Sequence, residues 1–458
     1  MQPGRDDRPN IVMIVADDHG REAVGCYGNP VVSTPNIDRL AERGVRFDNA
    51  FCTTASCGGS RSVILTGLHT HTNRTFGLVH QPHNFSTSLD VHTLPSLMRQ
   101  AGYRTGRMGK KHYQPESLFP FDLDPPEWGT DEDLARHRDD VWLADRCADF
   151  VSGDSDAPYF LYWCSHDPHR SWPRDDHPLH PDAFGNPTES FPGDDELRFD
   201  VGDVIVPPWL PDLPEVRAEL AEYYQSIARL DRGVGRLVEL VERGAGGRDT
   251  VIVYLSDNGG AFPVAKTTLY DPGMRLPLII SDSRRSGGDT CNALVTWADL
   301  APTLLDLAGS AELGSHMFGE SLLPLLDEPD APGRNHIFAS HSFHQVTNYY
   351  PMRVLRTHRW KFIVNIAWKL DFPTASDLHL SATWTSTVRE DQQLGGRDVD
   401  QYLHRPRFEL YDLDADPHEL VNVADQPEHA ELVAEFISLV QHFQLSTDDP
   451  WFHKWFYE

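Results

Sequence analysis

A thiol beside two glycines is the first feature of this chain that suggests chemistry. Cys57 begins the stretch CGGSR, and an apolar run, SVILTGL, follows it directly. Glycines permit a tight turn, and Ser60 or a neighbour can cap a helix that begins there. The thiol would then lie at a helix N-terminus, which favours negative charge, and Arg61 would add donors shaped for an oxyanion. The segment predicts a nucleophile that faces an anionic group; a buried structural cysteine is the alternative.

Oxygen-bearing side chains follow two apolar runs rich in β-branched residues. Asp17 and Asp18 follow NIVMIVA, and Asp257 and Asn258 follow TVIVYLS. Such runs are typical of strands buried on both faces of a parallel sheet, and the carboxyl ends of neighbouring strands converge. Oxygen-only ligands suit Ca²⁺ best, although Mg²⁺ and Mn²⁺ accept them too. The pattern predicts one divalent metal site, with plain polar turns as the alternative.

Basic residues also follow expected strand ends. Lys110 lies in GKKH, directly after an expected strand at 103–108, and Lys266 comes shortly after the DNGG turn. Lysine is scarce in this chain, with six among 40 basic residues, so its presence in a motif is informative. With Arg61, these lysines would form a local basic pocket.

Histidines accompany the same motifs. Lys110 and His112 occupy alternate positions, which on an extended strand would face the same side. His166 and His169 belong to SHDPHR, after an expected strand at 159–164. Imidazoles beside a metal are candidates for acid–base catalysis near neutral pH.

Strands and helices alternate as far as about residue 310, and antiparallel-type alternation follows. This order predicts an α/β fold at 1–345, with a doubly wound, mixed but mostly parallel sheet flanked by helices. Residues 346–458 are expected to form a smaller α+β domain with an antiparallel sheet and a closing helix.

Composition excludes several classes of partner. The formal net charge is −29, from 40 basic and 69 acidic residues, which argues against nucleic acid and anionic membranes. The six cysteines match no disulfide-scaffold or zinc spacing. No apolar run is long enough for a signal peptide or a membrane span, so we expect a cytoplasmic protein unless a leader has been removed.

The motifs resemble a known family when they are taken in order. DD after the first strand, CxxSRxxxLTG, GKxH, HDPH and DNGG are similar to the type I sulfatases of the alkaline phosphatase superfamily, over nearly the whole chain. Other stretches, such as TTLYDPG, VTNYYPMR and FELYDLDADPHE, resemble the N-sulfoglucosamine sulfohydrolases, or sulfamidases. The resemblance implies an alkaline-phosphatase-like fold.

The resemblance also implies a role for each motif residue. The residues matching the metal site are Asp17, Asp18, Cys57, Asp257 and Asn258. Cys57 matches the cysteine that these enzymes oxidise to formylglycine, whose hydrate attacks sulfur. Arg61 matches the residue that holds the hydrate, Lys110 and Lys266 match the residues that bind sulfate oxygens, His112 assists the hydrate, and His169 lies near the leaving group.

One position departs from the family pattern. The modification motif is C-x-P-x-R, and Gly59 stands where proline is expected. Three outcomes stay open: conversion of Cys57 to formylglycine by a formylglycine-generating enzyme, use of Cys57 as an unmodified thiolate nucleophile, or loss of turnover.

The sequence therefore predicts a metal-dependent hydrolase of N-sulfate or O-sulfate groups on a sugar. A phosphodiesterase or phosphonate monoester hydrolase of the same fold is one alternative, and a non-catalytic binder of sulfated glycans is another. Residues proposed for the sugar pocket are His341, His344, Tyr349 and the segment 114–140, which could equally pack between the lobes. The resemblance also suggests a homodimer.

Overall fold

The computed structural model describes residues 6–126, 129–153, 155–171, 182–191 and 197–457. Its main sheet contains seven strands, in the order β4 (Arg104–Gly109), β5 (Tyr159–Cys164), β1 (Asn10–Ala16), β6 (Thr250–Ser256), β7 (Leu278–Asp282), β2 (Val45–Phe47) and β8 (Asp289–Cys291). β7 runs antiparallel to both of its neighbours, and the other adjacent pairs are parallel. The predicted mixed, mostly parallel sheet is confirmed.

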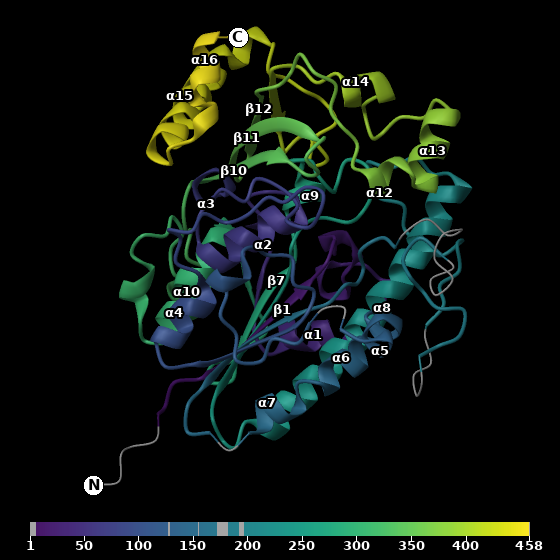
Figure 1. Ribbon diagram of the computed structural model, residues 1–458. Helices are drawn as coiled ribbons and strands as arrows, with labels where there is room; N and C mark the ends of the chain where they lie inside the picture. Colours follow the sequence, from purple (N-terminus) through teal and green to yellow (C-terminus); the bar gives the residue numbers. More distant parts are fainter. Residues whose placement is uncertain (1–5, 127–128, 154, 172–181, 192–196, 458) are drawn as a thin grey trace.

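Helices cover both faces of this sheet because its central strand is apolar on both sides. Ile11, Met13 and Val15 of β1 pack in a core with α2 (Cys57–Thr66), α4 (Leu94–Gln100) and α10 (Leu300–Leu307). The alternate residues of β1 pack in a second core with α1 (Pro35–Glu42), α6 (Asp140–Asp145), α7 (Ala148–Ser152) and α8 (Pro214–Gly244). Figure 1 shows α6, α7 and α8 on one side of the sheet and α4 and α10 on the other. The period-2 alternation of a strand thus places successive side chains in different cores.

A smaller antiparallel sheet lies toward the C-terminus. Its strands, in order, are β10 (His336–Phe343), β11 (Tyr349–Thr357), β12 (Trp360–Asn365) and β13 (Phe408–Asp412), and α15 (Ala430–Ser446) packs against it. β10 precedes residue 346, where we placed the start of the second domain, so this sheet begins earlier than the predicted boundary. The sheet starts earlier because β10 forms an antiparallel hairpin with β11, the next strand along the chain, and so belongs to the small sheet.

The remaining elements are short. They are β3 (Ala50–Phe51), β9 (Val295–Thr296), α3 (Thr70–Asn73), α5 (Asp131–Arg136), α9 (Asp271–Met274), α11 (Leu323–Asp327), α12 (Ser376–His379), α13 (Ala382–Arg389), α14 (Val399–Leu403), α16 (Lys454–Tyr457) and single 3₁₀ turns. Among the described residues, no helix has the length and apolar character needed to cross a membrane.

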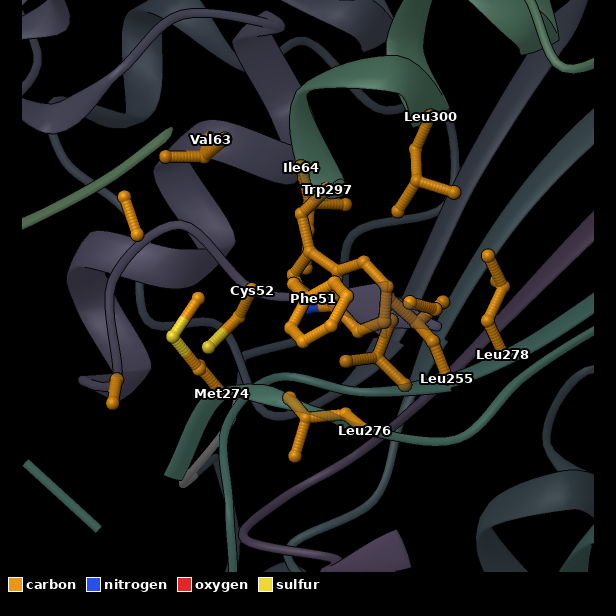
Figure 2. Packing of buried hydrophobic residues seen from close by; sticks show 14 of the residues in the cluster. Phe51, Cys52, Val63, Ile64, Leu255, Met274, Leu276, Leu278, Trp297 and Leu300 are labelled. Atoms are coloured by element: carbon orange, nitrogen blue, oxygen red, sulfur yellow. The ribbon is translucent and has the colours of Figure 1, made fainter. Parts of the chain in front are cut away.

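A dense apolar cluster supports α2. Figure 2 shows Ile64 of α2 close to Trp297 and Leu300, with Phe51 and Leu255 beside the indole. Trp297 is fully buried, and its Nε1 donates a hydrogen bond to the carbonyl oxygen of Ser256, 3.0 Å away. The indole therefore ties the helix that carries Cys57 to the end of β6.

Replacement of Trp297 by alanine should destabilise the whole domain. The loss of a fully buried indole leaves a cavity and should lower the free energy of unfolding by about 3–5 kcal/mol. Chemical denaturation followed by circular dichroism measures this change. Trp368→Ala is the matched control, since that side chain is 36% exposed and its loss should cost less than about 1 kcal/mol. Equal losses in the two variants would contradict the proposed support.

Candidate active site

Four adjacent parallel strands bring the predicted motifs to one edge of the sheet. β4, β5, β1 and β6 are neighbours, and all four point in the same direction. Lys110 follows β4 directly, and Asp17 and Asp257 follow β1 and β6. Since the carboxyl ends of parallel strands share an edge, residues far apart in the sequence become neighbours here.

The helix α2 begins at Cys57, as the glycine-rich turn predicted. Ser56 occupies the N-cap position in an extended conformation, but its side chain does not cap the helix. Its Oγ lies 2.9 Å from Nδ1 of His344 instead. Ser60 does not cap the helix either, because its Oγ donates to the carbonyl oxygen of Asp257 at 2.5 Å. Cys57 is buried, and its Sγ lies 3.8 Å from Oδ1 of Asp18.

Arg61 fixes α2 to the acidic strand ends. Its Nε donates to Oδ2 of Asp257 at 2.9 Å, and its guanidinium lies 3.7 Å from Oδ1 of Asp17. The side chain is completely buried. The guanidinium charge of Arg61 therefore compensates the charges of these two carboxylates. Arg61 lies one helical turn after Cys57 and points toward the same acids.

The acidic cluster has the features of a cation site. Asp17, Cys57 and Asp257 offer ligand atoms within 4.8 Å of one another, and so do Asp18, Cys57 and His169. Oδ1 of Asp17 is buried and has no hydrogen-bond partner among the described residues. A buried oxygen without a hydrogen-bond partner is costly, so this arrangement fits a bound divalent cation.

Asn258 completes this oxygen set. Its Nδ2 donates to Oδ1 of Asp18 at 2.6 Å and to the carbonyl oxygen of Gly259 at 3.0 Å. Its Oδ1 is buried and, among the described residues, lacks a donor. The amide thus offers an oxygen to a cation while its nitrogen holds a neighbouring carboxylate. All five predicted metal residues lie in this cluster, and His169 joins them at its border.

Two lysines contact the acids. Lys110 Nζ forms a short ion pair with Oδ2 of Asp17. Lys266 Nζ is fully buried and donates to Oδ2 of Asp18 at 2.8 Å, while Oδ2 of Asp377 lies 2.6 Å away. With Arg61, they form a group of three cations, each paired with a buried acid, inside an acidic protein.

His169 lies beside Lys266 in a defined tautomer. Its Nδ1 faces the carbonyl oxygen of Arg170 at 2.5 Å, so Nδ1 carries the proton. Its Nε2 lies 3.0 Å from Lys266 Nζ, which can only donate, so Nε2 accepts that hydrogen bond. Burial and the adjacent Lys266 ammonium lower the pKa of His169 to about 4.

Burial and neighbouring charges also shift the pKa values of the acidic groups. Burial raises the pKa of Asp257 to about 7, against the opposing effect of Arg61. Burial would raise the pKa of Asp17 as well, but Lys110 and its other basic neighbours hold it well below its usual range. Burial raises the pKa of Cys57, and the charges of Asp17 and Asp18 add to this effect.

The sequence predicted that Lys110 and His112, two residues apart, face the same side of an extended strand. In the structure His112 lies beyond the end of that strand. β4 ends at Gly109, and His112 has a positive φ of 44°, so the chain is no longer extended there. Its Nε2 lies 3.1 Å from Nδ1 of His80, and the two rings are stacked. His112 is still near enough to Lys110 for that charge, after burial, to lower its pKa.

The candidate sugar-pocket residues have different surroundings. His344 contacts Ser56, which precedes Cys57, and His341 Nδ1 lies 3.3 Å from Oγ1 of Thr54. Tyr349 accepts a hydrogen bond from Trp451 and packs within the C-terminal region. The segment 114–140 contains α5 and the start of α6, and several of its residues line a separate cavity; its residues 127–128 lie outside the described part. His166, from the SHDPHR motif, lines that cavity too.

Sequence reasoning missed two residues of the site. Asp377 of α12 pairs with Lys266, and nothing in its local sequence, SDLH, distinguishes it from a surface helix. Tyr223 of α8 donates from its hydroxyl to the carbonyl oxygen of Asp18 at 2.8 Å and accepts from the N–H of Gly20. Helical periodicity identified Tyr223 only as a core residue, because a tyrosine ring can pack in a core while its hydroxyl reaches a loop.

The fold and this site define a sulfatase. The profile of the Sulfatase family matches residues 9–310, and the chain belongs to that family. A second profile, N-sulphoglucosamine sulphohydrolase, C-terminal, matches residues 262–381, which include Lys266 and Asp377. The resemblance read from the motifs is thereby confirmed.

Individual relatives agree with this assignment. The chain is 36% identical to N-sulphoglucosamine sulphohydrolase of Homo sapiens, over 96% of this chain and 91% of the human protein. It is 27% identical to an N-acetylglucosamine-6-O-sulfatase of Bacteroides thetaiotaomicron, over 96% of this chain and 87% of that protein. A protein solved in complex with its substrate D-glucosamine-2-N,6-O-disulfate shares the fold, with a TM-score of 0.67, 23% identity, and coverage of 97% of this chain and 99% of that one.

Loss of one strand-end carboxylate should abolish metal binding. We expect Ca²⁺ to raise the melting temperature of the parent protein by mass action and to leave that of Asp17→Asn unchanged, as differential scanning fluorimetry with and without chelator would show. Asp231→Asn is the control: this buried carboxylate accepts backbone N–H bonds at the start of α1, so its loss should lower the melting temperature but preserve the Ca²⁺ response. A normal response in Asp17→Asn would refute the assigned ligand.

Proposed function

We propose that this protein hydrolyses the N-sulfate or O-sulfate group of a sugar, with residue 57 as the nucleophile. The observation that carries the proposal is the position of Cys57, which lies at the first turn of α2 beside the carboxylates and cations that follow β1, β4 and β6. The identity to the human sulfohydrolase supports an N-sulfated glucosamine unit as the substrate. The pocket supplies cations for an anionic group inside a protein of net charge −29.

The metal residues would hold one divalent cation. Asp17, Asp18, Asp257 and Asn258 are oxygen ligands, which favours Ca²⁺. When bound, the cation would offset negative charge on the transferred group.

Lys110 and Lys266 bind the sulfate oxygens in this proposal. Their ammonium groups already lie beside the acids, and the energetic value of such fixed charges is high in a buried site. Arg61 keeps α2, and with it residue 57, at a fixed position relative to β6 through its bond to Asp257.

His169 serves as the proton donor to the leaving nitrogen or oxygen. Its Nε2 is unprotonated in the observed tautomer, so it must first take up a proton. Against the effect of burial, Asp18 and Asp377 raise the pKa of Lys266, so its ammonium, 3.0 Å away, keeps its proton and orients Nε2 by a hydrogen bond; the proton for Nε2 comes from solvent. Lys266 and His169 thus act as a connected pair on the leaving-group side.

The state of residue 57 determines how it attacks. Formylglycine, formed from Cys57 by a formylglycine-generating enzyme, would supply the hydroxyl of a hydrated aldehyde as the nucleophile. Gly59 bears on this conversion because the family motif has proline there. In the folded protein a Cβ at position 59 would lie 2.9 Å from Cγ2 of Thr54 and 3.3 Å from Cγ2 of Thr70, so the two threonine methyl groups fill the space that a proline would need.

The mass of the peptide that contains Cys57 tests the nucleophile. We expect the lighter aldehyde in protein expressed in its own host, and turnover of glucosamine N-sulfate in a panel that also contains aryl sulfates and phosphodiesters. Cys57→Ala should lose at least about 10³-fold in kcat, whereas Cys52→Ala, which removes a buried thiol of the apolar core, should keep activity if folded. An intact thiol in active protein would exclude the aldehyde, and preferential turnover of phosphodiesters would exclude the proposed substrate.

A proline at position 59 should be tolerated only when Thr54, whose methyl group lies against it, is replaced by a smaller residue. Gly59→Pro alone should destabilise the protein by about 1–3 kcal/mol through overpacking. The double variant Gly59→Pro/Thr54→Ser lacks the crowded methyl group but keeps the hydroxyl that contacts His341, so it should recover most of this loss. Thermal unfolding measures stability, and peptide mass spectrometry measures the fraction of aldehyde. Thr54→Ser alone is the reference, and purely additive effects would contradict the crowding.

A further inference from the structure

Asp377 is a fourth carboxylate at the pocket, and it comes from the C-terminal part of the chain. Its Oδ2 lies 2.6 Å from Lys266 Nζ, and its Oδ1 accepts a hydrogen bond from the N–H of Leu378 at 3.1 Å. Its side chain is 19% exposed, whereas Lys266 and Asp18 are fully buried. Asp377 therefore lies on the outer side of Lys266, away from the strand-end acids.

The other charges of the pocket compensate one another. Among the described residues, the three cations pair with the three strand-end acids as Arg61 with Asp257, Lys110 with Asp17, and Lys266 with Asp18. His169 accepts a hydrogen bond from Lys266 and is neutral in that geometry. These pairs cancel, so a bound divalent cation would leave the pocket with two positive charges, and Asp377 would reduce this excess to one.

We propose that Asp377 determines the charge selectivity of the pocket, shifting its preference towards singly charged sulfate esters and sulfamates and away from doubly charged oxyanions. The inference rests on the proposed function for the identity of the bound group. A sulfated sugar carries one negative charge at the transferred group, whereas the released sulfate ion and phosphate monoesters carry two near neutral pH. Asp377 would thus weaken product binding more than substrate binding.

Coulomb's law sets the size of the effect. Repulsion from Asp377 is twice as large for a dianion as for a monoanion in the same position. For a unit charge pair about 6 Å apart at an effective dielectric constant of about 20, the interaction corresponds to roughly a hundredfold change in affinity. Solvent and the metal screen part of this, so we expect the selectivity between the two anions to change by at least about tenfold.

The test is calorimetric binding of two probes that differ in charge. Inorganic sulfate is the dianion and methyl sulfate is the monoanion, and both are titrated into Ca²⁺-saturated protein. Asp377→Asn removes the charge but keeps an oxygen that can accept from Lys266. We expect the affinity for sulfate, relative to that for methyl sulfate, to rise at least about tenfold in this variant.

Asp371→Asn is the matched control. It lies six residues earlier in the same segment, removes the same charge, and has a side chain that is 76% exposed beside His404. Its selectivity should equal that of the parent, because solvent screens a surface charge. Asp377→Glu, which keeps the charge, should also retain the selectivity of the parent.

An unchanged selectivity ratio in Asp377→Asn would overturn the proposal, as would an equal change for both anions. If the asparagine variant loses its metal, Asp377→Ser provides a second neutral side chain that is judged by the same ratio. The proposed function fails separately: a parent that binds both probes but hydrolyses no sulfated sugar refutes the sulfatase activity and leaves the charge comparison valid.

Discussion

Three buried ion pairs are the interactions on which this site depends. Arg61 with Asp257 joins α2 to β6, Lys110 with Asp17 joins the ends of β4 and β1, and Lys266 with Asp18 joins the turn after β6 to β1. A buried charge without a partner costs several kcal/mol, so removal of one member would destabilise the other. The same pairs that make burial of these charges tolerable also fix the relative positions of the strand ends.

The C-terminal part of the chain completes a site that the large sheet begins. Asp377 contacts Lys266, and His344 contacts Ser56, directly before Cys57. The second family profile, at residues 262–381, contains Lys266, His344 and Asp377. The sheet and α2 therefore provide the proposed metal ligands and the proposed nucleophile, while His344 and Asp377 of the C-terminal elements contact Ser56 and Lys266 beside them.

Much of the fold could be predicted from the sequence because its strong signals are local. The runs at 10–16 and 159–164 are apolar over their whole length, and the observed strands β1 and β5 have those bounds. The acids after β1 and β6 were predicted to converge because parallel strands end at a common edge. The start of the small sheet was placed too late, because β10 carries a mixture of polar and apolar residues that only pairing with β11 explains.

What the sequence did not predict about Asp377 and His112 depends on tertiary structure. Asp377 lies in a helix of four residues, and its role arises only when α12 packs beside Lys266. His112 was predicted as a site residue and lies near Lys110, but the expectation that the two face the same side assumed a strand that continues beyond Gly109; the strand ends there, and His112 stacks on His80. Periodicity and residue type do not indicate that α12 packs beside Lys266 or that the strand ends at Gly109.

The net charge of this protein affects the rate at which an anion encounters it, whereas the buried cations affect the free energy of the bound state. A net charge of −29 repels an anionic substrate at a distance and slows encounter, but solvent ions screen this field beyond about 10 Å at 0.1 M salt. The buried cations act within hydrogen-bond distance, where solvent screening is weak, and so determine the free energy of the bound state. An acidic surface is therefore compatible with an anion site, provided that cations such as Lys110 and Lys266 are themselves held by buried acids.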